Sequence, residues 1–279
     1  MSMTALLNKL AINTSVAREI LTAFIHDEVT RTRMTKAVLG LSGGVDSALV
    51  AYLTAQALGP EKVLGVRMPY KTSAQESMDH AGLVIDALGI QSETIEITAM
   101  VDPMFERRPD ISPLRKGNIM ARQRMIILYD CSAEFGGLVM GTSNKTETLL
   151  GYTTQFGDNA AALQPISDLY KNQVRQLAQA VGVPEPILAK PPSADLWPGQ
   201  TDESELGYSY DDVDQLLYLL VDRRHRLEDA VEQGFDAAFV KTVWERVRKT
   251  HYKRHMPIVA KLSQRTVGYD FLYMRDWGA

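Results

Sequence analysis

The sequence predicts an α/β protein in which helices cover both faces of a doubly wound parallel sheet, followed by a helical C-terminal region. Short apolar runs rich in strand formers alternate with stretches of helical periodicity up to residue 142. From Tyr210 onward the chain is mainly helical. Alternating strands and helices favour a parallel sheet with right-handed crossovers, and ligands of such sheets bind at the carboxyl ends of the strands.

The first predicted element is an amphipathic helix over residues 14–29, which Thr14 or Ser15 can cap. Ile25 and Val29 broaden its apolar face. Such a face usually packs against the core, and a contact between subunits is the alternative. The stripe along this face consists of Val16, Ile20 and Phe24.

Further strands and helices are predicted to alternate along the chain. The strands are expected at residues 37–41, 62–68, 93–97 and 136–142, and the helices at 47–58, 73–88 and 118–134. Residues 184–205 hold five prolines and little periodicity, which indicates a long loop, either a lid or a plain connector. We expect one continuous domain over residues 1–279.

Composition and charge argue against several classes of protein. With 45% hydrophobic and 23% charged residues, the chain has the balance of a soluble globular protein without a membrane span. The net charge of −4 gives no general attraction for nucleic acid. The single cysteine, Cys131, lies in an apolar run, so we expect a buried thiol and a cytoplasmic protein. The histidines show no spacing typical of a zinc site.

A glycine-rich segment, GLSGGVDS at residues 40–47, lies between the first strand and the next helix. Such a turn leaves backbone N–H groups free for phosphate oxygens, and the helix N-terminus adds a positive dipole end. Asp46 offers an oxygen ligand for Mg²⁺. The segment lacks the ending of a Walker loop and the spaced glycines of a dinucleotide fingerprint. The residues expected to approach or bind phosphate are Ser42, Gly43, Gly44 and Ser47.

This segment resembles the loop of the N-type ATP pyrophosphatases, and the rest of the chain narrows the resemblance to the NAD synthetase family, ammonia-dependent type. The resemblance implies a Rossmann-like fold of the adenine nucleotide alpha hydrolase kind. It spans about residues 15–255 and follows the family's order of motifs. The similar segments are VRMPYKTSAQESMDHA (66–81), GNIMARQRM (117–125), GTSNKTETLLGY (141–152), PISDLYKNQVR (165–175) and KPPSADLWPGQTDESELG (190–207).

The resemblance implies amidation of deamido-NAD to NAD with ATP and ammonia, through an adenylated intermediate that releases AMP and pyrophosphate. No segment corresponds to a glutaminase domain, so free ammonia or a separate glutaminase is the expected nitrogen source. A homodimer is also implied, with Val16, Ile20 and Phe24 as a contact. Two alternatives are an adenylating amide ligase for another carboxylic acid and an ATP sensor without chemistry. A sensor would lack a metal-binding carboxylate, whereas Asp46 and Glu147, the two carboxylates expected to bind metal, are both present.

Individual roles follow from the family's motifs. Asp46 and Lys171 are expected to be catalytic, and Asp46 and Glu147 to bind Mg²⁺. Arg122 matches a position that contacts the dinucleotide. Taken singly, these side chains can be solvated charges or surface ion pairs, but their joint spacing favours a site. The positions implied to contact ATP are Gly40, Leu41, Ser42, Gly43, Gly44, Val45, Asp46, Ser47, Thr142, Lys171 and Ser193.

Three positions depart from many ammonia-dependent members, all on the side of the acid substrate. Gln155 stands where a lysine contacts deamido-NAD, and Ala162 where an aspartate does so. Tyr252 replaces a histidine beside Lys253, and these positions complete the substrate-binding set. The synthetase domain of glutamine-dependent NAD synthetases is similar at these positions, so the departures are compatible with NAD synthesis.

Overall fold

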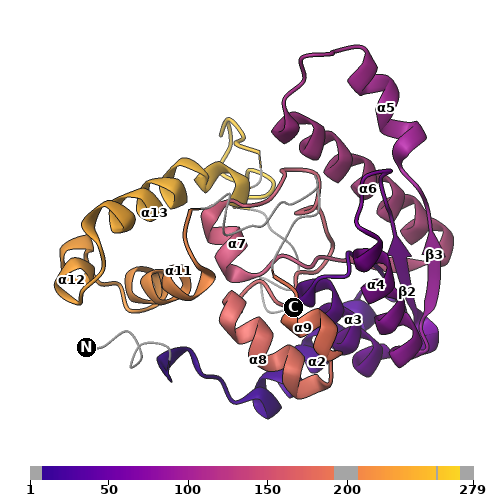
Figure 1. Ribbon diagram of the computed structural model, residues 1–279, viewed down its shortest axis with the longest axis horizontal. Coiled ribbons are helices and arrows are strands. Elements are labelled where there is room, and N and C mark those ends of the chain that lie inside the picture. Colours follow the sequence, from indigo (N-terminus) through magenta and orange to yellow (C-terminus); the bar gives the residue numbers. More distant parts are fainter. Residues whose placement is uncertain (1–7, 192–206, 256, 271–279) are drawn as a thin grey trace.

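The computed structural model describes residues 8–191, 207–255 and 257–270 (Figure 1). Within these ranges the sheet has four parallel strands in the order β3-β2-β1-β4. The register pairs Leu39 with Gly65 on one side and with Met140 on the other, so the carboxyl ends of the central strands lie level. The predicted parallel sheet is confirmed. Its strands are β1 (Lys36–Gly40), β2 (Val63–Arg67), β3 (Gln91–Thr94) and β4 (Gly137–Met140).

Helices cover both faces of this sheet (Figure 1). The side chains of β1 alternate between two cores, with Leu39 in one and Val38 in the other, and both are fully buried. The first core is completed by α2 (Thr14–Arg31), α3 (Val45–Leu58), α4 (Gln75–Leu88), α8 (Lys171–Val181) and α9 (Glu185–Ala189). The second is completed by α5 (Thr98–Glu106) and α6 (Pro113–Phe135). The doubly wound α/β fold is therefore confirmed.

Helix α2 differs from its prediction in two respects. Its N-cap is Asn13, whose side chain accepts a hydrogen bond from the Val16 N–H, so neither Thr14 nor Ser15 caps it. All three residues are common caps, and only the backbone conformation distinguishes them. Ile25 and Val29 are buried, but Val16, Ile20 and Phe24 are 47%, 61% and 38% exposed. The stripe is therefore not part of the core of this chain.

Three other boundaries are corrected. Strand β3 runs over Gln91–Thr94 rather than 93–97, because an edge strand needs only backbone pairing with β2 and its four side chains are exposed. Helix α6 begins at Pro113, after the N-cap Ser112, rather than at residue 118. The expected loop 184–205 opens with the short helix α9, where Pro186 fits the first turn. Residues 192–205 of that loop lie outside the described residues.

The C-terminal region packs around a third core that includes Leu150 and Tyr170 from the sheet-forming part. Its predicted helical character is confirmed as far as Arg254. The elements are α11 (Tyr210–Leu217), the π-helical turn η3 (Tyr218–Asp222), α12 (Leu227–Glu232), α13 (Ala237–Lys249) and the 3₁₀ turn η4 (His251–Arg254). Two further 3₁₀ turns are η1 (Asn8–Leu10) and η2 (Pro60–Lys62), and a short helix, α7 (Lys145–Leu150), follows β4.

Two expectations about single features can be compared with the structure. Cys131 is buried in α6, as expected, and burial raises the pKa of its thiol. Across the described residues, no helix combines the length and apolar character needed to cross a membrane.

Candidate active site

The glycine-rich loop connects β1 to α3 at the carboxyl edge of the sheet. Two serines shape it: the Ser47 hydroxyl donates to the Gly44 carbonyl at 3.0 Å, and the Ser42 hydroxyl lies 3.1 Å from that of Ser47. Gly44 is the N-cap of α3, and having no side chain it cannot cap the first N–H groups. These groups and the positive end of α3 therefore make a place for an anion.

Gly43 lets this loop pack closely against the first turn of α4. Its φ of 77° lies in the left-handed region, and a Cβ built on it would lie 2.2 Å from the Ser77 carbonyl oxygen. On the other side of Ser77, the Lys190 ammonium donates to the Ser77 hydroxyl at 2.9 Å. The position of the loop thus depends on a close backbone contact that only glycine permits.

The charged centre beside this loop is the ammonium of Lys171, the first residue of α8. Its Nζ lies 2.5 Å from Asp46 Oδ2 and 3.2 Å from Glu147 Oε1. Lys171 is only 2% exposed, which rules out a solvated charge at this position. A buried ammonium needs opposite charges and hydrogen bonds to offset its loss of water, and the two carboxylates supply them.

Asn144 connects Asp46 to helix α7. Its side-chain N–H₂ donates to Asp46 Oδ1 at 2.9 Å, and its carbonyl oxygen accepts from the Glu147 N–H at 2.9 Å. Glu147 in turn accepts from the Asn144 N–H, which completes a capping box. Sequence reasoning missed Asn144, although an asparagine three residues before a glutamate is the usual signal for such a box.

The remaining residues expected at the nucleotide are placed as follows. Thr142 lies in the segment between β4 and α7, and β4 pairs with β1, so Thr142 lies at the same edge of the sheet as the glycine loop. Ser193 lies outside the described residues. The structure therefore brings together Asp46, Glu147 and Lys171 from three helices, as their expected joint role requires.

Three of the five residues expected on the acid side, Arg122, Gln155 and Lys253, meet at the loop after α7. Arg122 on α6 donates from Nε and Nη2 to the Gln155 carbonyl, at 3.3 and 3.2 Å. The Lys253 ammonium donates to the carbonyls of Gly151 and Thr153, at 2.7 and 2.6 Å. Burial lowers the pKa of Lys253. These two cations thus hold the segment that carries Gln155.

The other two residues of this set lie apart from those contacts. Ala162 lies beside β4, and its N–H donates to the Val139 carbonyl at 2.9 Å. The Tyr252 side chain is exposed. Arg254, which sequence reasoning missed, donates to the carbonyls of Thr148 and Leu149 at the end of α7. Its other acceptors, the Val247 carbonyl and the Thr250 hydroxyl, are local, but no local pattern marks its contact with α7, because Thr148 and Leu149 are more than a hundred residues away in the chain.

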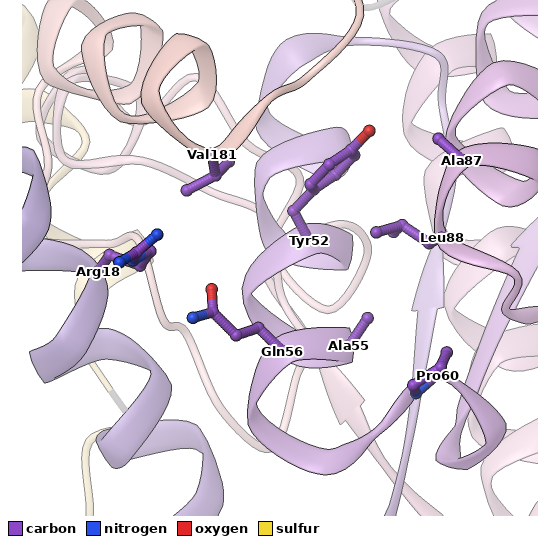
Figure 2. Close-up of a pocket in the computed structure, with 8 residues that line it drawn as sticks. All are labelled: Arg18, Tyr52, Ala55, Gln56, Pro60, Ala87, Leu88 and Val181. Atoms are coloured by element: carbon purple, nitrogen blue, oxygen red, sulfur yellow. The ribbon is translucent and has the colours of Figure 1, made fainter.

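Figure 2 shows a different hollow, of about 270 Å³, between α2, α3, α4 and α8. Arg18, Tyr52 and Gln56 supply its polar groups. Tyr52 and Gln56 belong to the second half of α3, whereas Asp46 lies in its first turn. This hollow is therefore separate from the charged centre, and none of the expected site residues lines it.

The chain is similar in sequence to known proteins. A family model described as NAD synthase matches residues 17–257. The NH(3)-dependent NAD(+) synthetase of Trichlorobacter lovleyi is 54% identical over 272 residues, which cover 98% of this chain and 100% of the relative. The NH(3)-dependent NAD(+) synthetase of Chlorobaculum tepidum is 55% identical over 258 residues, 92% of this chain and 93% of the relative.

Two solved structures are also similar. The NMN synthetase of Francisella tularensis superposes with a TM-score of 0.80 at 30% identity, covering 90% of this chain and 100% of that one. The NH3-dependent NAD synthetase of Campylobacter jejuni, in complex with the nitrate ion, gives a TM-score of 0.77 at 31% identity, with the same coverage of 90% and 100%.

The contact at Gly43 leads to a testable expectation. Gly43→Ala should displace the glycine loop, because the new Cβ would meet the Ser77 carbonyl. If the loop binds phosphate as the sequence predicts, this should weaken binding of ATP by about tenfold or more in isothermal titration calorimetry. Gly89→Ala is the matched control: Gly89 also has a positive φ, of 63°, but its Cβ would meet nothing within 4 Å. Undiminished binding by Gly43→Ala would contradict the proposed loop contact.

Proposed function

The chain belongs to the NAD synthase family, and we infer that its charged centre supports the family's reaction, amidation of deamido-NAD to NAD with ATP and ammonia. The protein is an enzyme of the ligase class that forms a carbon–nitrogen bond. The observation that carries the proposal is the convergence of Asp46, Glu147 and Lys171 beside the glycine loop.

The chemistry explains why such a centre is needed. A carboxylate is a poor electrophile at neutral pH, so AMP is first transferred to it and pyrophosphate leaves. Ammonia then attacks the activated carbonyl carbon, and AMP leaves with the electron pair of the broken bond. The attacking nitrogen loses one proton to solvent, which gives the amide. The protein's work is positioning and stabilisation of negative charge. In our proposal, residues 40–47 hold the phosphates, Thr142 and Ser193 contact ATP, and Lys171 stabilises charge at the reacting phosphate.

The donor set fits a magnesium ion. Asp46 and Glu147 already direct one carboxylate oxygen each at a single cation, the Lys171 ammonium. In the described ranges, no group of three or more His, Cys, Asp or Glu side chains could hold a metal. Mg²⁺ is commonly held by one or two carboxylates together with substrate phosphates and water. Asp46 and Glu147 would hold it, and when bound it would neutralise phosphate charge.

On the acid side, we propose that the loop held by Arg122 and Lys253 binds the substrate acid, with Gln155, Ala162 and Tyr252 lining its path. The loop is anchored from both sides, since Arg122 belongs to α6 and Lys253 to η4. A fixed loop costs less entropy when it binds substrate than a free one does.

A second candidate function differs only in the carboxylic acid that is amidated. The similarity to the Francisella tularensis NMN synthetase, together with the departures at Gln155, Ala162 and Tyr252, favours a mononucleotide acid as the alternative. The relatives above 50% identity are named NAD synthetases, which supports deamido-NAD. The two acids share the carboxylate that is amidated, so the same charged centre serves both.

We further propose a cytoplasmic homodimer that takes free ammonia, or ammonia from a separate glutaminase. The single buried cysteine suits a reducing compartment. This chain matches the whole length of the Trichlorobacter lovleyi relative, whose name specifies ammonia. The exposed stripe Val16, Ile20 and Phe24 on α2 supports a contact between subunits, because neighbouring apolar side chains on a surface mark interaction sites.

Replacing Asp46 tests the charged centre. Asp46→Asn should lower the rate of pyrophosphate release by about a hundredfold or more, because it removes a charge that acts on the phosphates. The melting temperature should fall too, because the buried Lys171 ammonium loses one of its two opposite charges, so turnover is measured at a temperature at which circular dichroism shows the variant to be folded. Asp86→Asn, on the exposed side of α4, is the matched control and should keep full turnover. Normal turnover by Asp46→Asn would refute the assignment.

Substrate assays test the reaction itself. With ATP, Mg²⁺ and ammonium, deamido-NAD should give equal amounts of NAD, AMP and pyrophosphate, whereas glutamine should not replace ammonium. The same assay with nicotinic acid mononucleotide decides between the two acids by comparing kcat/KM. Absence of both AMP and NAD in the first assay would exclude the proposed function.

Light scattering tests the dimer and its surface. The wild-type protein should have the mass of two chains, and Ile20→Glu should give the mass of one, because it places charge in an apolar contact. Ile126→Glu alters a similarly exposed residue of α6 (54% against 61% for Ile20), on the opposite side of the sheet, and should leave the dimer intact. A wild-type monomer would contradict the dimer, and dissociation by Ile126→Glu alone would place the contact on α6.

A further inference from the structure

A carboxylate outside the charged centre is buried between three helices. Asp214 lies on α11 and is completely inaccessible to solvent. Its Oδ1 accepts a hydrogen bond from the Thr146 hydroxyl of α7 at 2.5 Å. Its Oδ2 accepts from the N–H and the side-chain N–H₂ of Asn172 on α8, at 2.8 and 3.1 Å. Asp214 therefore ties the C-terminal region to both helices that supply Glu147 and Lys171.

The same contacts cap the N-terminus of α8. The first N–H groups of a helix lack partners within the helix and usually find them in a nearby N-cap side chain. Here the N–H of Lys171 donates to the Thr146 hydroxyl at 3.0 Å, and the N–H of Asn172 donates to Asp214. Two neighbouring helices thus supply the caps, which fixes where α8 begins relative to α7.

Asp214 occupies a position where an apolar residue would be expected. Tyr210, Val213 and Leu217 share its face of α11 at helical spacing, and all are buried. Burial raises the pKa of the Asp214 carboxyl to about 6, so its ionised form costs stability at neutral pH. Residues that break the local rule at such a cost are typical of functional sites.

We propose that Asp214 is a positioning residue for Lys171: through Thr146 and the first turn of α8, it fixes the point at which the Lys171 ammonium meets Asp46 and Glu147. This rests on the role proposed for Lys171. The Lys171 ammonium is at the end of a long side chain on the first residue of α8. A small shift of the first turn of α8 would therefore move the ammonium out of hydrogen-bonding distance of Asp46 and Glu147. Misplacement of a reacting group by about 1 Å can cost a hundredfold in rate.

Substitutions in the full-length enzyme test the proposal. Asp214→Ala and Thr146→Val should each lower kcat by about tenfold to a hundredfold. The KM for deamido-NAD should stay within about twofold, because Arg122 and Lys253 hold the acid-side loop independently. Asp214→Asn should restore most of kcat, since its carbonyl can accept from Asn172 and its amide can donate to Thr146. Asp211→Ala is the matched control, because Asp211 lies on the same helix, is exposed and pairs with Arg175 of α8 at 3.8 Å.

A double variant separates positioning from a general effect on folding. Lys171→Met should lower kcat, and adding Asp214→Ala to it should cause no further loss, because Asp214 acts through Lys171. A further loss equal to that in the wild-type background, or a kcat of Asp214→Ala within twofold of wild type, would overturn the inference. Failure of Asp214→Asn to restore activity would do so too. If Lys171→Met alone kept full turnover, the proposed role of Lys171 would fail, and this inference with it.

Discussion

The ammonium of Lys171 holds together segments that are far apart in the chain. It joins Asp46, at the start of α3, to Glu147, in α7, and it does so where solvent barely reaches. Two carboxylates this close would repel each other without a cation between them. The arrangement of the glycine loop, of α7 and of α8 around one point therefore depends on this ion-pair triad.

The C-terminal region stabilises α7 and α8, the two helices that supply Glu147 and Lys171. Its helices contribute Asp214 to the caps of α8 and place Arg246, Lys253 and Arg254 on the carbonyls at the end of α7 and just beyond it. The last carbonyls of a helix lack partners within the helix, and cations suit them because the helix dipole is negative there. A six-residue helix is too short to be stable alone, so α7 relies on these contacts at its C-terminal end.

Local patterns predicted the strands and helices that build the sheet, because hydrophobic periodicity reports burial directly. They were less accurate at boundaries. Strand β3 pairs through its backbone with no buried side chain, and α6 begins five residues earlier than its periodicity indicates. Two readable signals were missed: Asn144 opens a capping box, and Asp214 is a carboxylate on an apolar helix face. The contact of Arg254 with the Leu149 carbonyl, by contrast, could not be inferred from any nearby residue, because 105 residues separate the two in the chain.

The sequence by itself determined the α/β alternation, the glycine loop between β1 and α3, and the motifs shared with the NAD synthase family. These are properties of short segments, in which spacing and residue type decide the structure. Only the tertiary structure decided that Lys171 is buried between Asp46 and Glu147, and that Asp214 caps its helix. Lys171 and Asp46 are 125 residues apart, and their contact exists because packing against the sheet brings the starts of α3 and α8 together.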